Sequence, residues 1–533
     1  MKVILATAKQ QIMEREWLPP LSLGYIAASL ESKGIEVAIV DSEVNRYDSK
    51  KASEEILSHK PDAVGITTTT NNRLEAIQLC NAIREKSKTL IFVGGPHFTP
   101  TARDALEKVK CIDVVVRREG EITTLEMLEA YSLKKGFFDI PGISFRDEDG
   151  KIVENAERPF IQDLDTIPMP AYHLFSLKKY NARLEGEYQS PNTIGVVSSR
   201  GCPYDCNFCA NNALWRRSLR TRNPEKFVDE IEYLYDKYGY RSFDIWDDTM
   251  TIKKPHVKGI CEEILKRKLD IKWYARSRVD SVNKEILGLM KEAGCVSMGF
   301  GVESGSPRIL KSIQKGITIP VVKSIIKASA DLGFYTKAFF ILSLPGEEQE
   351  DVSASLSLIK ELNSYGKNVM AGAGIAKIYP GTEMERIAMS KEILPSNFSW
   401  NTECEFPINR LFNDIVSVPL FVQPQLPLES LYVEIDRMQK RALSDWFWLI
   451  IKSLIEMRNL GELKIRITKF KIGALSYSSQ DILEIMLTNE ADFLSAKTWL
   501  KKKGYECSMQ KVPEKESRIG YLYVVLEKNK KAP

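Results

Sequence analysis

The chain has 533 residues, of which 44% are hydrophobic and 27% are charged. This length predicts about three globular domains, and the composition excludes a disordered or low-complexity chain. The 75 basic and 71 acidic residues leave a net charge of +4, which is too near balance to indicate a nucleic-acid partner.

The nine cysteines comprise one tight group of three and six scattered residues. This pattern favours a metal site in a reducing cytoplasm over a disulfide framework. The N-terminus MKVILATAKQ has the pattern of a first strand and lacks the cleavage site of a signal peptide. No apolar run approaches the ~18 residues of a membrane-spanning helix, so we expect no transmembrane segment.

Residues 1–135 alternate between strand and helix patterns. Strands are predicted at 3–6, 37–40, 63–68, 90–93 and 114–116, and helices at 21–30, 72–85 and 121–131. Continuous apolar strands between helices indicate a doubly wound parallel sheet that is covered on both faces. Such sheets bind ligands at the carboxyl ends of their strands, here the loops 67–72, 94–99 and 117–121.

Residues 136–190 are rich in proline and predict an irregular connector. Within it, Asp149-Gly150 lies between two apolar stretches and predicts a hairpin turn.

The strand–helix alternation resumes in residues 191–395. Strands are predicted at 193–198, 242–246, 272–275, 296–302, 336–342 and 373–378. Helices include 224–238, where Asn223 suits the N-cap and Pro224 the first turn, and 284–293. Six such units predict a partial (β/α)6 barrel, because the segment is too short for eight.

Residues 396–533 predict a small α/β cap or substrate domain, with a strand–helix–strand–strand order between 482 and 528. A helix is predicted at 443–457 and carries Trp446, Phe447 and Trp448. Such a stripe is typical of a core or a domain interface, and contact with a lipid-like substrate is the alternative.

The segment SSRGCPYDCNFCANN places Cys202, Cys206 and Cys209 in C-x3-C-x2-C spacing after the first strand of the predicted barrel. Thiolates are the usual ligands of iron–sulfur clusters. Three thiolates leave one iron of a [4Fe–4S] cluster open, and an open position suits catalysis. A structural zinc site is the alternative, although zinc prefers four protein ligands.

This loop resembles the motif of the radical S-adenosylmethionine (SAM) superfamily, with Phe208 as its aromatic residue. The resemblance implies that SAM chelates the open iron through its amino and carboxylate groups. It also implies that one electron from the cluster cleaves SAM to a 5′-deoxyadenosyl radical, which abstracts hydrogen from an unreactive carbon. An external donor of the flavodoxin or ferredoxin type would supply that electron.

The resemblance continues at the carboxyl ends of the later predicted strands, over residues 193–385. It implies that Asp247 or Asp248 accepts from the SAM amino group and that Glu303 reaches the SAM hydroxyls. The further cofactor positions that it implies are Arg278, Gly346 and Gly381. Gly299 and Gly301 would let a bulky ligand approach the fourth strand. Solvated strand-end carboxylates and ordinary Pro-Gly turns are the alternatives for the acidic and glycine positions.

Residues 1–130 contain the segments WLPPLSLGYIAASLESKGIEVAIVDSE, PDAVGITTTT, VGGPHFTP and VVVRREGEIT. These segments resemble the cobalamin-binding domain that precedes many radical SAM domains. The cofactor-binding candidates of this domain are Thr68, Gly94, Gly95, His97 and Glu119. No D-x-H-x-x-G motif supplies a histidine to cobalt, and His97 could be a cobalt ligand or a hydrogen-bonding loop residue. Arg118 stands where glycine is common in the family.

Taken together, these motifs imply a cobalamin-dependent radical SAM methyltransferase that acts on an unactivated carbon of a small-molecule or natural-product substrate. A cyclase or rearrangement enzyme of the anaerobic tetrapyrrole type is the alternative with the same cofactors. A tRNA methylthiotransferase is disfavoured because residues 1–130 contain only two cysteines, Cys80 and Cys111. A non-catalytic B12 or iron–sulfur sensor is the alternative from another class.

Overall fold

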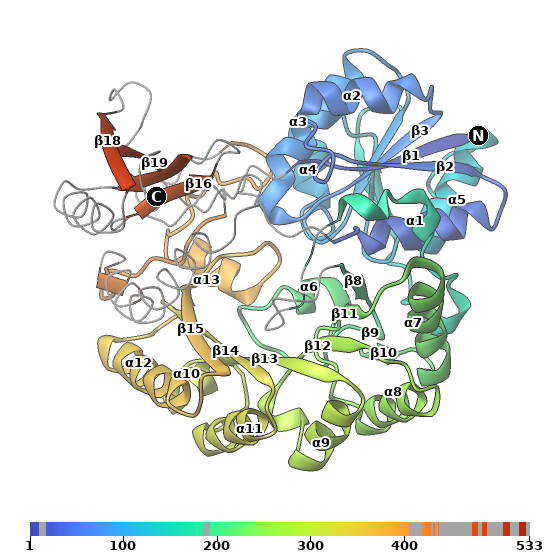
Figure 1. Cartoon of the computed structure of the whole chain (residues 1–533). Helices are drawn as coiled ribbons and strands as arrows, with labels where there is room; N and C mark the ends of the chain where they lie inside the picture. The colour runs from blue at the N-terminus through green and yellow to red at the C-terminus, as the bar shows by residue number, and fades with distance from the viewer. Residues whose placement is uncertain are drawn as a thin grey trace. The chain divides into compact units, whose positions relative to one another are not determined.

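The computed structural model describes residues 1–9, 18–180, 182, 184, 192–403, 418–427, 430, 431 and 435, and the backbone of four C-terminal strands (Figure 1). The N-terminal and central parts of the chain form one compact unit, and the four C-terminal strands belong to a second. In the described part of the chain, no helix is long and apolar enough to cross a membrane.

The N-terminal sheet begins with five parallel strands in the order β2-β1-β3-β4-β5. They are β1 (Lys2–Thr7), β2 (Glu36–Asp41), β3 (Ala63–Thr67), β4 (Leu90–Gly94) and β5 (Val114–Val116). The order reverses between β1 and β3, and ligands of such sheets bind in the crevice at this reversal. The doubly wound sheet expected from the sequence is therefore confirmed.

Helices cover both faces of this sheet, and each face has its own apolar core. The helices are α1 (Leu21–Glu31), α2 (Ser49–Ser58), α3 (Arg73–Arg84), α4 (Ala102–Lys108) and α5 (Glu121–Ser132), and a short turn, η1 (Thr70–Asn72), precedes α3. The sequence did not predict α2, because this polar helix buries only Ala52, Ser53 and Ile56. A helix with so few buried positions carries a weak apolar period.

The segment expected to be an irregular connector continues this sheet. It forms the hairpin β6 (Ile143–Arg146) and β7 (Ile152–Glu154), whose β6 pairs antiparallel with β5. Gly150 has φ +79° in the predicted turn. The irregular part of the segment follows the hairpin, with the short turns η2 (Leu164–Thr166), η3 (Tyr172–Leu174) and η4 (Leu177–Lys179).

The central domain is an open six-stranded parallel sheet in the order β15-β14-β13-β12-β11-β8. Its strands are β8 (Thr193–Val196), β11 (Ser242–Ile245), β12 (Lys272–Ser277), β13 (Cys295–Glu303), β14 (Tyr335–Leu342) and β15 (Val369–Ile375). The partial barrel predicted from the sequence is confirmed. Its last strand begins earlier than the predicted 373–378, because Gly372 and Gly374 interrupt the apolar pattern.

Helices lie outside these strands, as Figure 1 shows for α7 to α9, α11 and α12. They are α7 (Pro224–Tyr238), α8 (Lys254–Lys266), α9 (Lys284–Glu292), α10 (Pro307–Ser312), α11 (Ile319–Asp331), α12 (Gln349–Asn363) and α13 (Glu383–Ser390), with the turn η5 (Val279–Ser281) before α9. The side chain of Asn223 accepts from the backbone N–H groups of Glu225 and Lys226, which confirms the predicted cap of α7.

The C-terminal unit contains a four-stranded antiparallel sheet in the order β16-β17-β19-β18. Its strands are β16 (Ile472–Tyr477), β17 (Ile482–Leu487), β18 (Tyr505–Lys511) and β19 (Leu522–Lys528). The last three match strands expected from the sequence, whereas β16 was not predicted. The helix expected at 443–457, with Trp446, Phe447 and Trp448, lies outside the described residues.

Candidate functional site

The loop that carries the three cysteines leaves the carboxyl end of β8. Two short strands in it, β9 (Ser199–Arg200) and β10 (Arg220–Thr221), pair antiparallel and close the loop at its base. Gly201 has φ +89°, and a Cβ built on it would lie 2.0 Å from the carbonyl oxygen of Ser218. Only glycine fits this position, so the sequence around the cysteines fixes the path of the loop.

Cys202, Cys206 and Cys209 are free thiols. The backbone N–H of Cys209 donates to the carbonyl of Cys206 at 3.1 Å, which draws the loop into a tight turn. Burial raises the pKa of the Cys209 thiol to about 12 and so favours the protonated thiol. A bound metal reverses this preference, because a coordinated thiol is deprotonated.

Among the described residues, no three His, Cys, Asp or Glu side chains converge on one metal ion. A cubane cluster does not need such convergence, because each cysteine binds a different iron. The three thiols would then each bind a different iron of a [4Fe–4S] cluster, whereas the zinc alternative requires ligands at about 2.3 Å from one ion. Phe208 lies half-buried on the same loop.

Asp247 is almost fully buried and anchors the start of the cysteine loop. Its Oδ1 accepts from the backbone N–H groups of Ser198 and Ser199 at 2.8 and 3.0 Å. Its Oδ2 accepts from both serine hydroxyls at 2.6 Å. Burial raises the pKa of Asp247, and these four hydrogen bonds oppose that rise. A carboxylate used in this way has little capacity left for a ligand.

Asp248, the next residue, lies in a crowded part of the protein, and its side chain still reaches solvent. Its Oδ2 accepts from the backbone N–H of Gly201 at 3.1 Å, which points the carboxylate toward the cysteine loop. Burial by the surrounding protein, and then the neighbouring Asp247, raise the pKa of Asp248. Of the two aspartates that the sequence offered for the SAM ammonium group, the geometry therefore favours Asp248.

Arg278 reaches the cysteine loop from the end of β12. Its guanidinium lies over the Tyr204 ring at 3.6 Å and places Nη1 3.9 Å from the sulfur of Cys206. Nε and Nη2 donate to the two carboxylate oxygens of Asp280 at 2.9 and 2.8 Å. These contacts bring Arg278 to the cluster loop itself, where its charge faces a thiolate ligand.

Glu303 ends β13 with φ +70° and is paired with Lys315 at 2.7 Å. A Cβ built on Gly301 would lie 2.4 Å from Glu303 Oε1, so Gly301 makes room for this pair. Gly299 similarly accommodates the hydroxyl of Tyr274, at 2.3 Å from a Cβ built there. The two glycines thus accommodate protein side chains rather than the bulky ligand that the sequence led us to expect.

The glycines after the last two barrel strands lie in tight turns, each with φ +76°. The N–H of Gly346 donates to Gln423 at 2.9 Å. A Cβ built on Gly381 would lie 2.8 Å from the Cβ atoms of both Ala213 and Pro100. Gly381 therefore lets the barrel approach α6 (Asn211–Trp215) and the N-terminal domain closely.

Small residues occupy the predicted ligand edge of the N-terminal sheet. Thr68 donates to Asn72 at 2.8 Å, and Gly94 ends β4. Gly95 has φ +95°, and a Cβ there would lie 2.7 Å from the carbonyl oxygen of Thr68. The buried amide oxygen of Asn71, in the same loop, lacks a hydrogen-bond partner among the described residues. An unpartnered acceptor beside small residues fits a ligand that carries amide groups, as cobalamin does.

His97 is fully buried and does not face a ligand. Its Nδ1 lies 3.3 Å from Thr70 Oγ1, and its Nε2 lies 3.3 Å from Asn401 Oδ1. The rings of Phe98 and Trp400 pack edge-on against the imidazole. Because both nitrogens have partners, this geometry favours the hydrogen-bonding loop residue over the cobalt ligand.

Burial lowers the pKa of His97 to about 3. As the pH falls, this histidine is therefore protonated in the unfolded chain before it is protonated in the folded chain. The stability contributed by neutral His97 is complete above about pH 6.5 and falls by about 1.4 kcal/mol per pH unit below it. Between pH 7 and pH 5 the free energy of unfolding should fall by about 2 kcal/mol less in His97→Gln than in the wild type. Urea unfolding at both pH values measures it, and His59→Gln, at a half-exposed histidine of the same domain, is the control.

Glu119 lies at the centre of a buried ion-pair cluster and is 6% exposed. Its carboxylate accepts from Arg200 at 2.8 Å, from Arg220 at 2.8 Å and from the backbone N–H of Ile161 at 2.8 Å. Arg200 and Arg220 lie on β9 and β10, at the base of the cysteine loop. In this structure Glu119 therefore joins the two domains, and its contact with a cofactor stays a prediction.

Several residues at the site were missed in the sequence. They are the anchors Ser198 and Ser199, the arginines Arg200 and Arg220, the Glu303 partner Lys315, and Trp400 and Asn401 beside His97. All of them act through partners that lie at least 12 positions away along the chain, and the two serines through a partner 48 or 49 positions away. Ser198 and Ser199 precede the motif directly, and their hydroxyls could have suggested a buried acceptor nearby.

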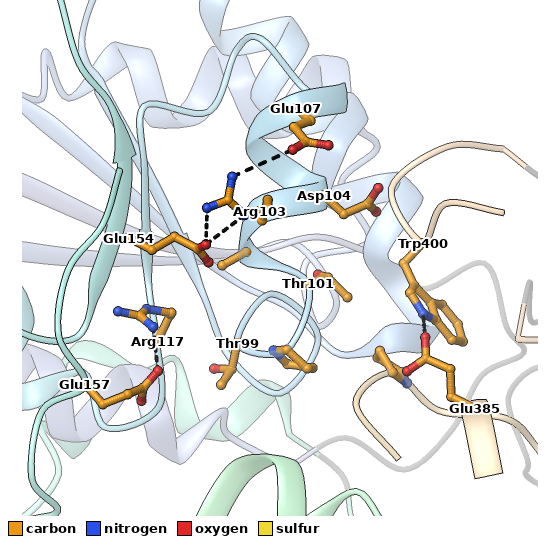
Figure 2. Close-up of a pocket in the computed structure, with 13 residues that line it drawn as sticks. Thr99, Thr101, Arg103, Asp104, Glu107, Arg117, Glu154, Glu157, Glu385 and Trp400 are labelled. Carbon is orange, nitrogen blue, oxygen red and sulfur yellow. Dashed lines mark hydrogen bonds and ion pairs between the residues drawn. The ribbon is translucent and has the colours of Figure 1, made fainter. Parts of the chain in front are cut away.

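A polar cleft of about 430 Å³ lies between the N-terminal domain and the barrel loop at 380–385 (Figure 2). Its lining comprises Thr99, Pro100, Thr101, Ala102, Arg103, Asp104, Glu107, Arg117, Glu154, Glu157, Pro380, Glu385 and Trp400. Arg103 pairs with Glu154 and Arg117 with Glu157, as the dashed lines show. None of the three cysteines lines this cleft, so it is separate from the predicted cluster site.

Two family models match the chain. The radical SAM superfamily model matches residues 196–359, and the B12 binding domain model matches residues 3–128. These spans coincide with the barrel and with the N-terminal sheet described above. The order of the two domains is the order that the sequence resemblance implied.

Among curated proteins, an uncharacterised methyltransferase of Pyrococcus horikoshii is 35% identical over 70% of this chain and 80% of its own length. The anaerobic magnesium-protoporphyrin IX monomethyl ester cyclase of Rubrivivax gelatinosus is 31% identical, over 65% of this chain and 62% of its own length. Both a methyltransferase and a cyclase are thus similar to this chain.

Among solved structures, the radical SAM methyltransferase TsrM from Kitasatospora setae, with cobalamin and a [4Fe–4S] cluster bound, superposes with a TM-score of 0.60. It is 19% identical, and the match covers 73% of this chain and 75% of that one. At this identity the likeness establishes the fold.

Proposed function

Because this chain belongs to the radical SAM superfamily and carries a B12-binding domain, we propose that it is a cobalamin-dependent methyltransferase acting on an unactivated carbon of a small molecule. One observation carries the proposal. The cysteine loop and the cobalamin-type sheet are joined through Glu119, Arg200 and Arg220, so two cofactor-binding units form one structure.

Each cofactor has candidate ligands in this chain. Cys202, Cys206 and Cys209 would hold the cluster, Asp248 would accept from the SAM amino group, and the loop around Asn71 would face cobalamin. When bound, the cluster supplies the electron that cleaves SAM, and cobalamin supplies a carrier for the methyl group. Cobalamin with no protein histidine on its metal suits this edge, because His97 is buried and paired.

The residues of the chain orient these groups. Asp247 fixes the first turn of the cysteine loop, and Arg278 places a positive charge beside Cys206. The Glu303–Lys315 pair fixes the end of β13, where the resemblance implies contact with the SAM hydroxyls. Positions fixed by buried hydrogen bonds keep reacting groups aligned and raise the rate of a bimolecular step.

Reaction with the same cofactors but without methyl transfer is the second candidate. The similarity to a protein named as an anaerobic cyclase favours it. The identity of the product separates the two, because methylation adds one methylene unit to the substrate whereas cyclisation removes hydrogen. The electron donor in either case is proposed to be a flavodoxin- or ferredoxin-type protein.

Anaerobic purification with iron, sulfide and hydroxocobalamin tests the proposed function. We expect the absorption spectrum to show both a cluster and cobalamin, and dithionite with SAM to give 5′-deoxyadenosine. A protein that takes up no cobalamin would rule out methylation by this route. A protein that binds both groups yet never cleaves SAM would be a sensor.

We expect Asp248→Asn to raise the KM for SAM in reductive cleavage about tenfold or more, because a neutral amide replaces the charge-assisted partner of the ammonium group. Iron content should stay at the wild-type value, since Asp248 is not a cysteine-loop anchor of the kind that Asp247 is. Steady-state 5′-deoxyadenosine formation at varied SAM concentration gives the KM. An unchanged KM would remove Asp248 from the SAM site.

A further inference from the structure

Arg118 holds an energetically unfavourable backbone conformation at the end of β5. Its φ is +65°, in the left-handed region that a residue with a Cβ adopts at a cost of roughly 1–3 kcal/mol. Such a conformation persists only when surrounding contacts determine it. The backbone N–H of Arg118 donates to Thr99 Oγ1 at 2.9 Å, and the remaining contacts come from the side chain.

The guanidinium of Arg118 reaches out of the N-terminal domain to α6. Nη1 donates to the carbonyl oxygen of Ala213 at 2.8 Å and also to that of Leu214. A helix leaves the carbonyls of its last turn without internal donors, and a cation suits this negative end. Nε donates to Glu157 at 2.7 Å, so the fork of the guanidinium is held on both sides.

Helix α6 connects this clamp to the cysteine loop. It begins two residues after Cys209, the last of the three cysteines. The Asn212 side chain donates to Asp205, which lies between the first two cysteines. A helix of five residues has little stability of its own, so contacts at its two ends decide its position.

We infer that Arg118 is a positioning residue through which the cobalamin-binding domain holds α6, and with it the cysteine loop, in the geometry that binds SAM. The step from the cysteine loop to SAM rests on the proposed function. Arg118 itself touches neither the cysteines nor Asp248 among the contacts of the described residues, so its effect passes through the helix.

The variant Arg118→Gly removes the clamp and also relieves the backbone strain, since glycine adopts φ +65° freely. The chain should therefore fold, with an unfolding temperature close to that of the wild type. Lys134→Gly is the matched control, because Lys134 is exposed in the same domain and has φ +53°. Arg118→Lys keeps the charge but cannot span two carbonyls and a carboxylate at once.

Two measurements on the reconstituted full chain test the inference. Hydrogen exchange of the peptide that contains α6, measured without SAM, should become faster in Arg118→Gly and Arg118→Lys and stay at the wild-type rate in Lys134→Gly. Titration of the reduced cluster with SAM, followed by its electron paramagnetic resonance signal, should show Kd raised roughly tenfold in the two Arg118 variants only.

Unchanged exchange at α6 in Arg118→Gly overturns the inference, as does faster exchange with an unchanged Kd for SAM. If the wild-type cluster does not respond to SAM at all, the proposed function fails. The exchange measurement then still decides whether Arg118 holds the helix, so the two failures are distinguishable.

Discussion

Replacing Cys209 by alanine is expected to abolish SAM cleavage and to reduce bound iron to a small fraction of the wild-type value. The three thiols lie on one loop, and that loop supplies every cysteine ligand that the cluster would have. With two cysteines left, two of the four irons lack a protein ligand, where the intact site leaves only one iron open for SAM. Fe–S cofactors depend on their thiolates in this way.

The control for Cys209→Ala is Cys261→Ala. Cys261 is fully buried on α8 and lies outside the cysteine loop. This variant loses a buried sulfur and some stability, while iron content and SAM cleavage should stay at the wild-type values. Iron and sulfide assays together with 5′-deoxyadenosine formation decide the comparison. Wild-type iron in Cys209→Ala would show that this thiol is not a ligand.

The fold was largely predictable because its signals are local. Parallel strands covered on both faces appear as short apolar runs, and both sheets were found in this way. Cysteine spacing and the cap at Asn223 are equally local. The structure added α2, the short α4, β16 and the shifted start of β15. In α2 polar residues hide the apolar period, and in β15 glycines do.

The roles of individual site residues were less predictable, because they depend on partners distant in sequence. Asp247 and Asp248 are neighbours with the same side chain, yet only the buried hydroxyls of Ser198 and Ser199 distinguish them. His97 looked accessible because Asn401, which contacts it, lies more than three hundred residues later. Periodicity and spacing describe one segment of the sequence at a time. They therefore carry no information about contacts between residues that lie far apart in the sequence.

Glu119 illustrates the same limit with the largest energetic consequence. The sequence placed it at a strand end and suggested a cofactor contact, whereas the structure surrounds it with Arg200 and Arg220. Nη1 of Arg220 donates to both carboxylate oxygens of Glu119, whereas its Nε and Nη2 atoms have no hydrogen-bond partner in the described part of the chain. The positive charge of Arg220 is therefore balanced chiefly by Glu119.

We expect Glu119→Ala to lower the free energy of unfolding by about 3–5 kcal/mol, because it leaves a buried guanidinium without its counter-charge. The loss should appear in protein that contains no cobalamin, since the ion pairs exist within the chain itself. Glu154→Ala is the control, because its partner Arg103 is largely exposed, and such pairs contribute about 0–1 kcal/mol. Chemical denaturation of both variants without cofactor measures the difference. The role of Glu119 as a joint between the domains would be contradicted if the cofactor-free variant kept the wild-type free energy of unfolding. Weaker cobalamin binding in the same variant would then support a contact between Glu119 and the cofactor.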